Sequence, residues 1–361
     1  MKILIVVTKS ELGGAQVVVL NLAQGLKARG LDVSVAGGPG EYLPEELKKN
    51  GISFYRFKNL ERSYNPFKVL KFISELKEYV KREKFTTVHL NSTNALFGVW
   101  GLTKLDQKPK IIFTVHGLSF LDPNYQTNFL FSSVYKLFFK LAWKKVNNLI
   151  FVSRLNYLNA LSRGLTKKGE VIYNGLNLPD GYFLDSSEAR RILGEKIGVD
   201  LSNSYIYGSI GRLACPKNYE FLINAYNEIK KIKPLAKLLI IGEGPDRAKY
   251  ETLIKSYRLE REVYLLGEIK EASRYLKAFD LFVLPSIFEG MSLSLMEARA
   301  AGVSVLASHV GGNEEVVGIE NCFKLNDLAD FLKKLSAKKN QANLSDFSID
   351  KMIEAYLNIY I

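Results

Sequence analysis

Residues 281–302 read LFVLPSIFEGMSLSLMEARAAG. An apolar run, Leu281–Leu284, is followed by a short polar loop and then by a helical pattern that ends at Gly302, a residue favoured just after a helix C-terminus. A buried strand, a loop and a helix in this order form the repeating unit of parallel α/β sheets. The stretch therefore predicts an α/β fold.

The same alternation extends outward along the chain in both directions. Short runs rich in Val and Ile alternate with stretches of helical periodicity. The predicted strands are 2–8, 32–36, 52–57, 86–90, 111–115, 148–152 and 169–173 in the first half, and 204–210, 236–241, 262–266, 280–284 and 303–307 in the second. The predicted helices include 15–29, 67–82, 218–232, 246–257 and 291–301.

The polar, glycine-containing stretch Asn174–Ser187 separates the two series of strands. We therefore expect two Rossmann-like domains, residues 1–175 and 176–345, each with a doubly wound parallel sheet, facing one another across a cleft. A closing helix at about residues 346–361 packs either on the second domain or back on the first. Ligands of such sheets bind beyond the carboxyl ends of the strands, so the loops there are the candidate sites.

The composition is that of a globular protein. Of the 361 residues, 47% are hydrophobic and 24% are charged. Two cysteines, Cys215 and Cys322, make no disulfide framework and have no metal-ligand spacing, which favours a reducing, cytoplasmic location. The first apolar run, Ile3–Val7, is too short for a secretory signal, and no stretch approaches the ~20 apolar residues of a membrane span.

The positive charge lies in one half of the chain. Residues 1–180 contain 26 Lys and Arg against 13 Asp and Glu, whereas residues 181–361 contain 24 of each kind, and the formal net charge is +13. Such a one-sided field attracts nucleic acid, an anionic membrane or an anionic ligand. The alternative is a protein made soluble by its lysines.

Three loops after predicted strands carry residues suited to phosphate. Gly13 and Gly14 open a helix, where backbone N–H groups bind anions, and they favour phosphate binding only slightly over a tight turn without a ligand. Arg212 and Lys217 flank a loop and could neutralise a diphosphate, whereas either residue alone could be a solvated cation. The glycines of Gly242–Pro245 either admit a ligand or shape the turn.

The loop after Leu284 has the densest pattern. Glu289 lies before the predicted helix, and Glu297 lies within it, among apolar residues where its carboxylate needs hydrogen-bond donors such as a ribose diol. Backbone N–H groups at a helix start suit oxyanions or sugar hydroxyls. The residues that supply them here are Gly290, Met291, Ser292 and Leu293.

Taken together and in order, these motifs resemble those of the GT-B-fold, family 4 retaining glycosyltransferases, which build bacterial surface polysaccharides and glycolipids. The resemblance extends over essentially the whole chain. Each motif is weak alone, and the ordered set is specific. The motifs are Gly13-Gly14, Val171–Asn177, Gly211–Asn218, Gly242–Pro245 and Glu289-x7-Glu297.

The resemblance implies roles for the residues of the donor site. Gly13 and Gly14 would leave room for the donor diphosphate, which Arg212 and Lys217 would hold as it leaves. Glu297 would bind the ribose hydroxyls.

On the sugar side, the resemblance implies that Glu289 contacts the transferred sugar, assisted by the amides of Gly290–Leu293. His116 follows a predicted strand in the first half and matches the family histidine that reaches the sugar and the reaction centre. By itself, a loop histidine is more often structural.

The implied reaction transfers a hexosyl group, with retention of configuration, from a nucleotide-diphosphate sugar to a sugar or lipid-linked acceptor. UDP is the expected nucleotide, and GDP is second. The sequence contains no Asp-x-Asp, so we expect no metal or cofactor, the fixed cations replacing a divalent ion. We expect Glu289 to position the sugar and stabilise charge, whereas a glycosidase-like nucleophile is the alternative.

The basic half would face the acceptor. Lys136, Lys140 and Lys144 recur on one face of an aromatic-rich segment, Tyr125–Asn148, and Phe67–Lys84 is a second basic segment. Either could be an amphipathic helix on the inner face of an anionic membrane, or a core helix with a solvated edge.

Other classes fit less well. A Rossmann dehydrogenase needs G-x-G-x-x-G, which the Gly13-Gly14 turn lacks. A GT-B nucleotide-sugar epimerase or hydrolase would share the diphosphate site and needs no acceptor. A nucleic-acid-binding protein could use the basic half, but its aromatic residues follow apolar periodic runs.

Overall fold

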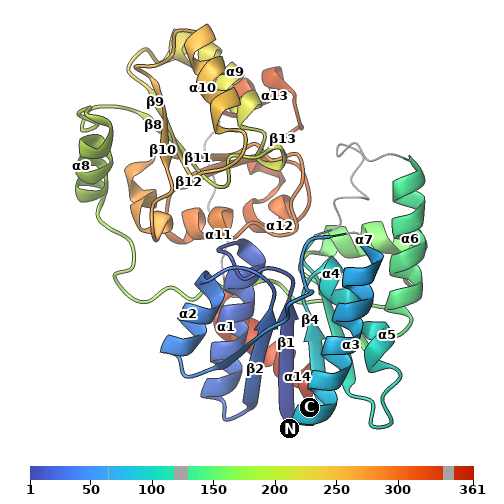
Figure 1. Ribbon diagram of the computed structural model, residues 1–361. Helices are drawn as coiled ribbons and strands as arrows, with labels where there is room; N and C mark the ends of the chain where they lie inside the picture. The colour runs from blue at the N-terminus through green and yellow to red at the C-terminus, as the bar shows by residue number, and fades with distance from the viewer. Residues whose placement is uncertain (64, 118–128, 336–344) are drawn as a thin grey trace. The chain divides into compact units, whose positions relative to one another are not determined.

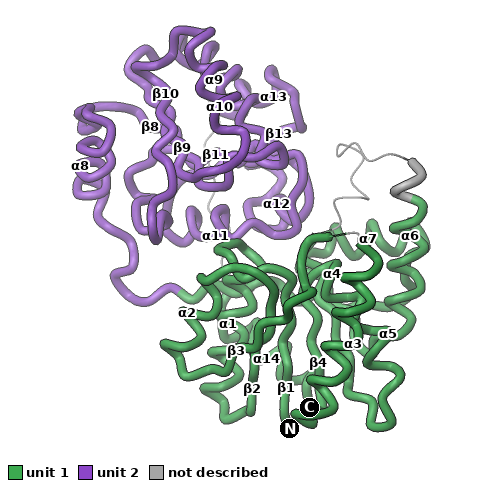
Figure 2. The backbone as a smooth tube through the Cα atoms, viewed as in Figure 1, with its two compact units in different colours: residues 1–177, 346–361 green, residues 178–345 purple. Residues whose placement is uncertain are grey.

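A computed structural model describes residues 1–63, 65–117, 129–335 and 345–361. The chain forms two compact units, shown in green and purple in Figure 2. Unit 1 comprises Met1–Asn177 and Asp346–Ile361, and unit 2 comprises Leu178–Ser345. The closing segment thus belongs to the first unit, and the expected boundary at residues 175 and 176 lies close to the observed division.

Unit 1 contains a parallel sheet whose described strands have the order β3-β2-β1-β4-β5-β6-β7. Figure 1 labels its strands β2, β1 and β4. The strands are β1 (Lys2–Val7), β2 (Asp32–Gly37), β3 (Ser53–Arg56), β4 (Thr87–Leu90), β5 (Lys110–Val115), β6 (Asn148–Phe151) and β7 (Glu170–Val171). The helices are α1 (Gly14–Ala28), α2 (Tyr42–Lys49), α3 (Pro66–Glu83), α4 (Thr93–Leu96), α5 (Val99–Leu102), α6 (Phe129–Trp143), α7 (Arg154–Ser162) and α14 (Ile349–Tyr360).

Unit 2 contains a second parallel sheet, with the order β10-β9-β8-β11-β12-β13. Its strands are β8 (Ile206–Ile210), β9 (Lys237–Ile241), β10 (Val263–Gly267), β11 (Leu281–Leu284), β12 (Ser304–Ser308) and β13 (Cys322–Phe323). The helices are α8 (Ser186–Ile197), α9 (Tyr219–Ile232), α10 (Arg247–Ser256), α11 (Leu293–Ala300), α12 (Asn313–Val317) and α13 (Leu328–Leu335). The prediction of two doubly wound parallel α/β sheets is confirmed.

Two details differ from the sequence prediction. Strand β13 has two residues, which is too short to give an apolar pattern. Helix α11 begins at Leu293 and not at residue 291, because the Ser292 side chain accepts a hydrogen bond from the Leu295 N–H and ends the loop there.

Each sheet has a position where the strand order reverses. In unit 1 this position lies between β1 and β4, and in unit 2 between β8 and β11. At such a position the loops beyond the carboxyl ends diverge to opposite faces of the sheet and leave space for a ligand. The loops after these four strands are therefore the places to look for a site.

Helix α14 completes unit 1. It packs on α1, where Gly25 leaves no room for a side chain beside Ile353. Its two tyrosines also enter a buried polar cluster: Tyr360 Oη lies 2.5 Å from Nδ1 of His89, and Tyr356 Oη lies 2.9 Å from Thr114 Oγ1. The C-terminal residues are thus part of the core of the first unit.

This packing makes a prediction about stability. Ile353 is fully buried, so Ile353→Ala should leave a cavity and lower the free energy of unfolding of unit 1 by about 2–5 kcal/mol. Urea unfolding measures the change. The control is Ile232→Ala on α9, where the side chain is 69% exposed and the change should stay within about 0.5 kcal/mol. An equal effect of the two substitutions would contradict the packing of α14.

Candidate functional site

In unit 2, the loops that follow β8 and β11 are joined at the position where the strand order reverses. The Ile287 N–H donates to the Pro216 carbonyl at 2.9 Å, and the Asn218 amide donates to the Pro285 carbonyl at 3.1 Å. These bonds fix the loop that carries Lys217 against the loop that carries Glu289. Two sequence segments about seventy residues apart therefore form one surface at the strand ends.

The centre of this surface is an ion pair. Lys217 Nζ lies 2.7 Å from Glu289 Oε1, and the side chains are only 23% and 12% exposed. Ser286 Oγ donates to the same oxygen at 2.7 Å. Both donors bind Oε1, and no described residue bonds Oε2, which leaves that oxygen able to accept from a ligand. Lys217 is therefore the counter-ion of Glu289 in this structure.

Arg212 is the second predicted cation of this loop. Its side chain is exposed, and no residue in the described part of the chain pairs with it. Its backbone is braced by the loop after β9, since the Leu213 N–H donates to the Glu243 carbonyl at 3.0 Å. A side chain at Gly242 or Gly244 would collide with the carbonyls of Gly211 or Leu213. These glycines thus allow close packing of two loops that holds the Arg212 backbone in place.

The start of α11 lies beside Glu289. The first N–H groups of a helix have no carbonyl one turn earlier to bind, so those of Leu293 and Ser294 suit an oxyanion. The Gly312 N–H donates to the Gly290 carbonyl at 2.8 Å, and a side chain at Gly311 would collide with the Glu289 carbonyl. The segment that contains Gly311 and Gly312 therefore packs against the loop before the helix.

Glu297 lies one turn into α11 and is partly buried. Burial raises the pKa of its carboxyl to about 7, and a hydrogen bond with Ser273 opposes the rise. Ser273 Oγ also lies 2.9 Å from Tyr182 Oη. A carboxylate held among so few donors gains from a ligand that brings hydroxyl groups to it.

In unit 1, Gly13 and Gly14 follow β1. Gly13 is the N-cap of α1 with an extended backbone, and a side chain there would meet Gln16 Oε1 at 2.7 Å. The Thr8 N–H donates to Ser92 Oγ at 3.0 Å, which joins the loops after β1 and β4. This is the position where the order of the first sheet reverses.

His116 follows β5, the strand next to β4. Its Nε2 lies 3.0 Å from Asn91 Oδ1, and burial lowers the pKa of the ring to about 4. Each predicted site residue therefore follows a strand of its own unit, and of these residues the structure brings Lys217 and Glu289 into direct contact. Asn91, Ser273, Ser286 and Tyr182 gave no signal in the sequence, because a lone Ser, Asn or Tyr gains meaning only from its neighbours in space.

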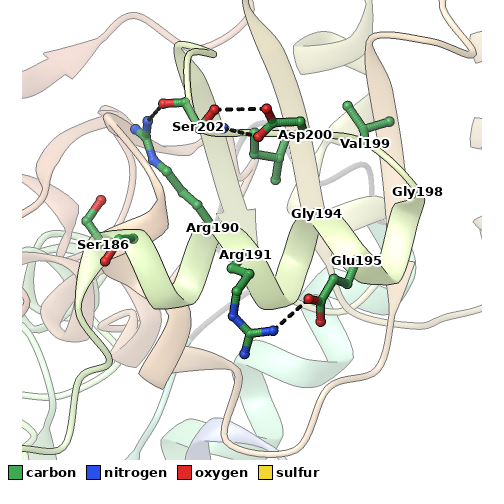
Figure 3. A pocket seen from close by; sticks show the side chains of 11 residues that line it. Ser186, Arg190, Arg191, Gly194, Glu195, Gly198, Val199, Asp200 and Ser202 are labelled. Carbon is green, nitrogen blue, oxygen red and sulfur yellow. Dashed lines mark hydrogen bonds and ion pairs between the residues drawn. The ribbon is translucent and has the colours of Figure 1, made fainter.

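A separate hollow of about 900 Å³ lies between α8 and residues 198–202 (Figure 3). Its charged side chains are already paired. Arg190 binds Asp280 and the Ser202 carbonyl, and Arg191 binds Glu188 and Glu195. With its cations neutralised in this way, the hollow lacks the charge that the β8 and β11 loops provide.

Comparison with known proteins identifies the class that this fold and these loops define. Residues 12–179 match the family model "Glycosyltransferase Family 4", and residues 196–344 match "Glycosyl transferases group 1". Together the two matches span most of the chain. The protein belongs to this family of glycosyltransferases and has the GT-B fold.

Individual relatives are similar over most of their length. A galactosyltransferase of Escherichia coli, named for transfer from UDP-Gal to α-D-GlcNAc-diphosphoundecaprenol, is 27% identical over 97% of this chain and 94% of its own. An α-monoglucosyldiacylglycerol synthase of Acholeplasma laidlawii is 26% identical over 82% of this chain and 77% of its own.

Solved structures support the fold. A sucrose-phosphate synthase from Thermosynechococcus elongatus has a TM-score of 0.82 at 21% identity, covering 100% of this chain and 98% of its own. An Anabaena protein in complex with UDP and glucose has a TM-score of 0.79 at 18% identity, covering 99% of each chain.

The ion pair can be tested by a double-mutant cycle. Lys217→Met leaves Glu289 without its counter-ion, and Glu289→Gln leaves the ammonium without its partner, so each should destabilise unit 2. The double variant should recover part of the loss, with a coupling energy of about 1–3 kcal/mol in urea unfolding. Strict additivity would contradict a direct contact. Lys231→Met with Glu228→Gln, an exposed pair, is the control and should couple by less than about 0.5 kcal/mol.

Proposed function

We propose that this glycosyltransferase moves a hexosyl group from a UDP-sugar to a lipid-linked sugar acceptor, with retention of configuration. The observation that carries the proposal is the partly buried Lys217–Glu289 pair, with Lys217 and the exposed Arg212 in one loop, at the position where the order of the second sheet reverses. The named activity of the Escherichia coli relative and the UDP complex of the Anabaena structure support the choice of donor and acceptor.

The leaving diphosphate would be held by charge. Arg212 supplies a guanidinium that can bind two oxygens, and the start of α11 adds backbone N–H groups. As the diphosphate enters, Lys217 can share its charge between the phosphate and Glu289. Fixed cations of this kind stabilise the negative charge of the transition state, and we propose that the reaction needs no metal ion or cofactor.

Two carboxylates would hold the rest of the donor. Glu297 would accept hydrogen bonds from the ribose hydroxyls, and Gly13 and Gly14 would leave space for the diphosphate at the start of α1. Glu289 would receive a sugar hydroxyl at Oε2 while Lys217 and Ser286 hold Oε1. This arrangement suits a positioning carboxylate, and we assign it no covalent intermediate.

We further propose that unit 1 binds the acceptor at an anionic membrane surface, on the cytoplasmic side. Helix α6 carries the supporting feature, an exposed stripe of aliphatic side chains beside the predicted lysine face. Phe139 and Trp143 are buried in the core, whereas Val134, Leu137 and Leu141 are exposed by 68%, 58% and 46%. Tyr125 lies outside the described residues.

Lysines accompany this apolar stripe. Lys140 and Lys144 are exposed beside it, and Lys136 is partly exposed, which gives the helix the composition of one that lies at a membrane interface. The second basic segment, α3, also exposes Phe67 and Leu70. None of the helices in the described ranges is long and apolar enough to cross a bilayer.

The first test is transfer itself. Incubation with UDP-galactose or UDP-glucose and a synthetic GlcNAc-diphosphate-lipid should give a product that keeps the donor's anomeric configuration, by NMR, and that still forms in excess EDTA. Glu289→Ala should lower kcat by about 100-fold or more, since it removes transition-state contacts. Conversion of the nucleotide sugar without any acceptor would instead indicate an epimerase or hydrolase. An inverted product would overturn retention of configuration, and loss of activity with EDTA would overturn a reaction without a metal ion.

The pH dependence of donor binding tests Glu297. Because the pKa of the free carboxyl is about 7, protonation below that pH should remove the acceptor for the ribose hydroxyls and weaken binding of a UDP-sugar by up to about tenfold from pH 8 to pH 6. Isothermal calorimetry measures the affinity. Glu297→Gln should bind weakly and without this pH dependence, and an unchanged profile in the variant would contradict the role.

Membrane binding has its own test. The full chain should float with vesicles rich in anionic phospholipid at low salt and not with neutral vesicles. Replacing Leu137 and Leu141 by Ser should reduce flotation without changing the melting temperature, because both side chains are exposed. Equal flotation of the variant would show that the exposed face of α6 does not bind the membrane. If the native chain does not float, the proposal that unit 1 binds an anionic membrane is wrong.

A further inference from the structure

We propose that Asn91 sets the tautomer of His116, so that the ring presents an unprotonated Nδ1 that accepts a hydroxyl hydrogen from a substrate. Asn91 is then a positioning residue and His116 a neutral hydrogen-bond acceptor. The inference deepens the proposed function, on which the contact between His116 and a substrate rests, but the tautomer itself is a property of unit 1 alone.

The argument starts from Asn91, which follows β4 directly and is 1% exposed. Its backbone N–H donates to the Val6 carbonyl at 2.8 Å, which fixes it between the two central strands. Its side-chain amide, Nδ2, donates to the His89 carbonyl at 3.3 Å. A flipped amide would set Oδ1 against that carbonyl oxygen, placing two acceptors together, so the orientation is determined.

With the amide fixed, Oδ1 is the atom that faces His116, at 3.0 Å from Nε2. An amide oxygen only accepts hydrogen bonds, so Nε2 must carry the hydrogen. A neutral imidazole carries a single ring hydrogen, and Nδ1 therefore has a free lone pair. No described residue bonds Nδ1.

The surroundings keep the ring neutral. Burial lowers the pKa of His116 to about 4 and that of the nearby His89 to about 3. His89 is itself held on both sides, by Tyr360 Oη and, at 2.7 Å, by Thr114 Oγ1. The titratable groups packed on His89 are thus the phenols of Tyr356 and Tyr360, whose pKa values burial raises, and neither is charged near neutral pH.

A neutral acceptor has a chemical consequence for glycosyl transfer. Positive charge develops on the sugar as its bond to the diphosphate breaks, and an imidazolium would oppose it. A neutral ring does not, and its Nδ1 can select a substrate by one hydroxyl group.

The chain is suited to a direct test because it contains three histidines, His89, His116 and His309. Imidazole ¹⁵N NMR of the full chain separates protonated from unprotonated ring nitrogens, and His116→Gln assigns the signals. We expect His116 to be neutral and protonated at Nε2 from pH 8 to pH 5. A ring protonated at Nδ1, or charged at pH 7, would overturn the proposal.

Variants of Asn91 extend the test. Asn91→Asp keeps the size of the side chain and places a carboxylate beside Nε2, which should raise the pKa of His116 and give turnover an acid limb between pH 6 and pH 8. Turnover is measured as kcat at saturating donor, where the pH dependence of donor binding through Glu297 does not enter, and there the wild type and Asn50→Asp, an exposed control, should lack this limb. A charged ring in Asn91→Asp with a flat pH profile would overturn the acceptor role of Nδ1.

The two levels of the proposal fail differently. If His116 has the expected tautomer but His116→Gln transfers sugar at the native rate, His116 does not contact the substrate. The proposed hydrogen bond from a substrate hydroxyl to Nδ1 is then wrong as well. If His116→Gln is inactive and the tautomer is the other one, the proposed function stands and this inference alone is overturned.

Discussion

The contact between Lys217 and Glu289 is the constraint on which the rest of the second unit depends. It joins the loops after two neighbouring strands, and backbone bonds from Ile287 and Asn218 fix the same two loops. A partly buried charge is stable only when it is compensated, so each residue requires the other in the absence of ligand. An entering diphosphate offers Lys217 a second partner, and the site can thus bind an anion without creating a buried, unpaired ammonium.

The first unit is organised by neutral polar groups. Its returning helix α14 supplies Tyr356 and Tyr360 to the cluster around His89, and Asn91 joins that cluster to His116. The C-terminal residues are thus connected to the predicted reaction centre through hydrogen bonds, as well as through the apolar packing of Ile353 on α1. The two units present different chemistry at their strand ends: fixed charges in the second and neutral acceptors and donors in the first.

Gly242 and Gly244 show what the local sequence leaves open and what the tertiary structure decides. Gly242 and Gly244 permit ligand contact and close backbone packing equally well when only their sequence is known. The structure places both against the carbonyls of the Arg212 loop, which a side chain would displace.

Helix α6 is a second example. The periodicity of its lysines predicted an exposed face. It did not show that aromatic residues between the lysines pack into the core while aliphatic residues are exposed.

The sequence by itself determined the alternation of strands and helices, the two parallel sheets and the loops that hold Arg212, Lys217, Glu289 and Glu297, because periodicity and turn residues are local properties. Membership of the glycosyltransferase family followed from the order of those loops. Only the tertiary structure decided that Lys217 pairs with Glu289, that α14 returns to the first unit, and that Asn91 faces His116. These contacts join residues far apart in the chain, and their geometry is set by strand order and packing, which no local pattern records.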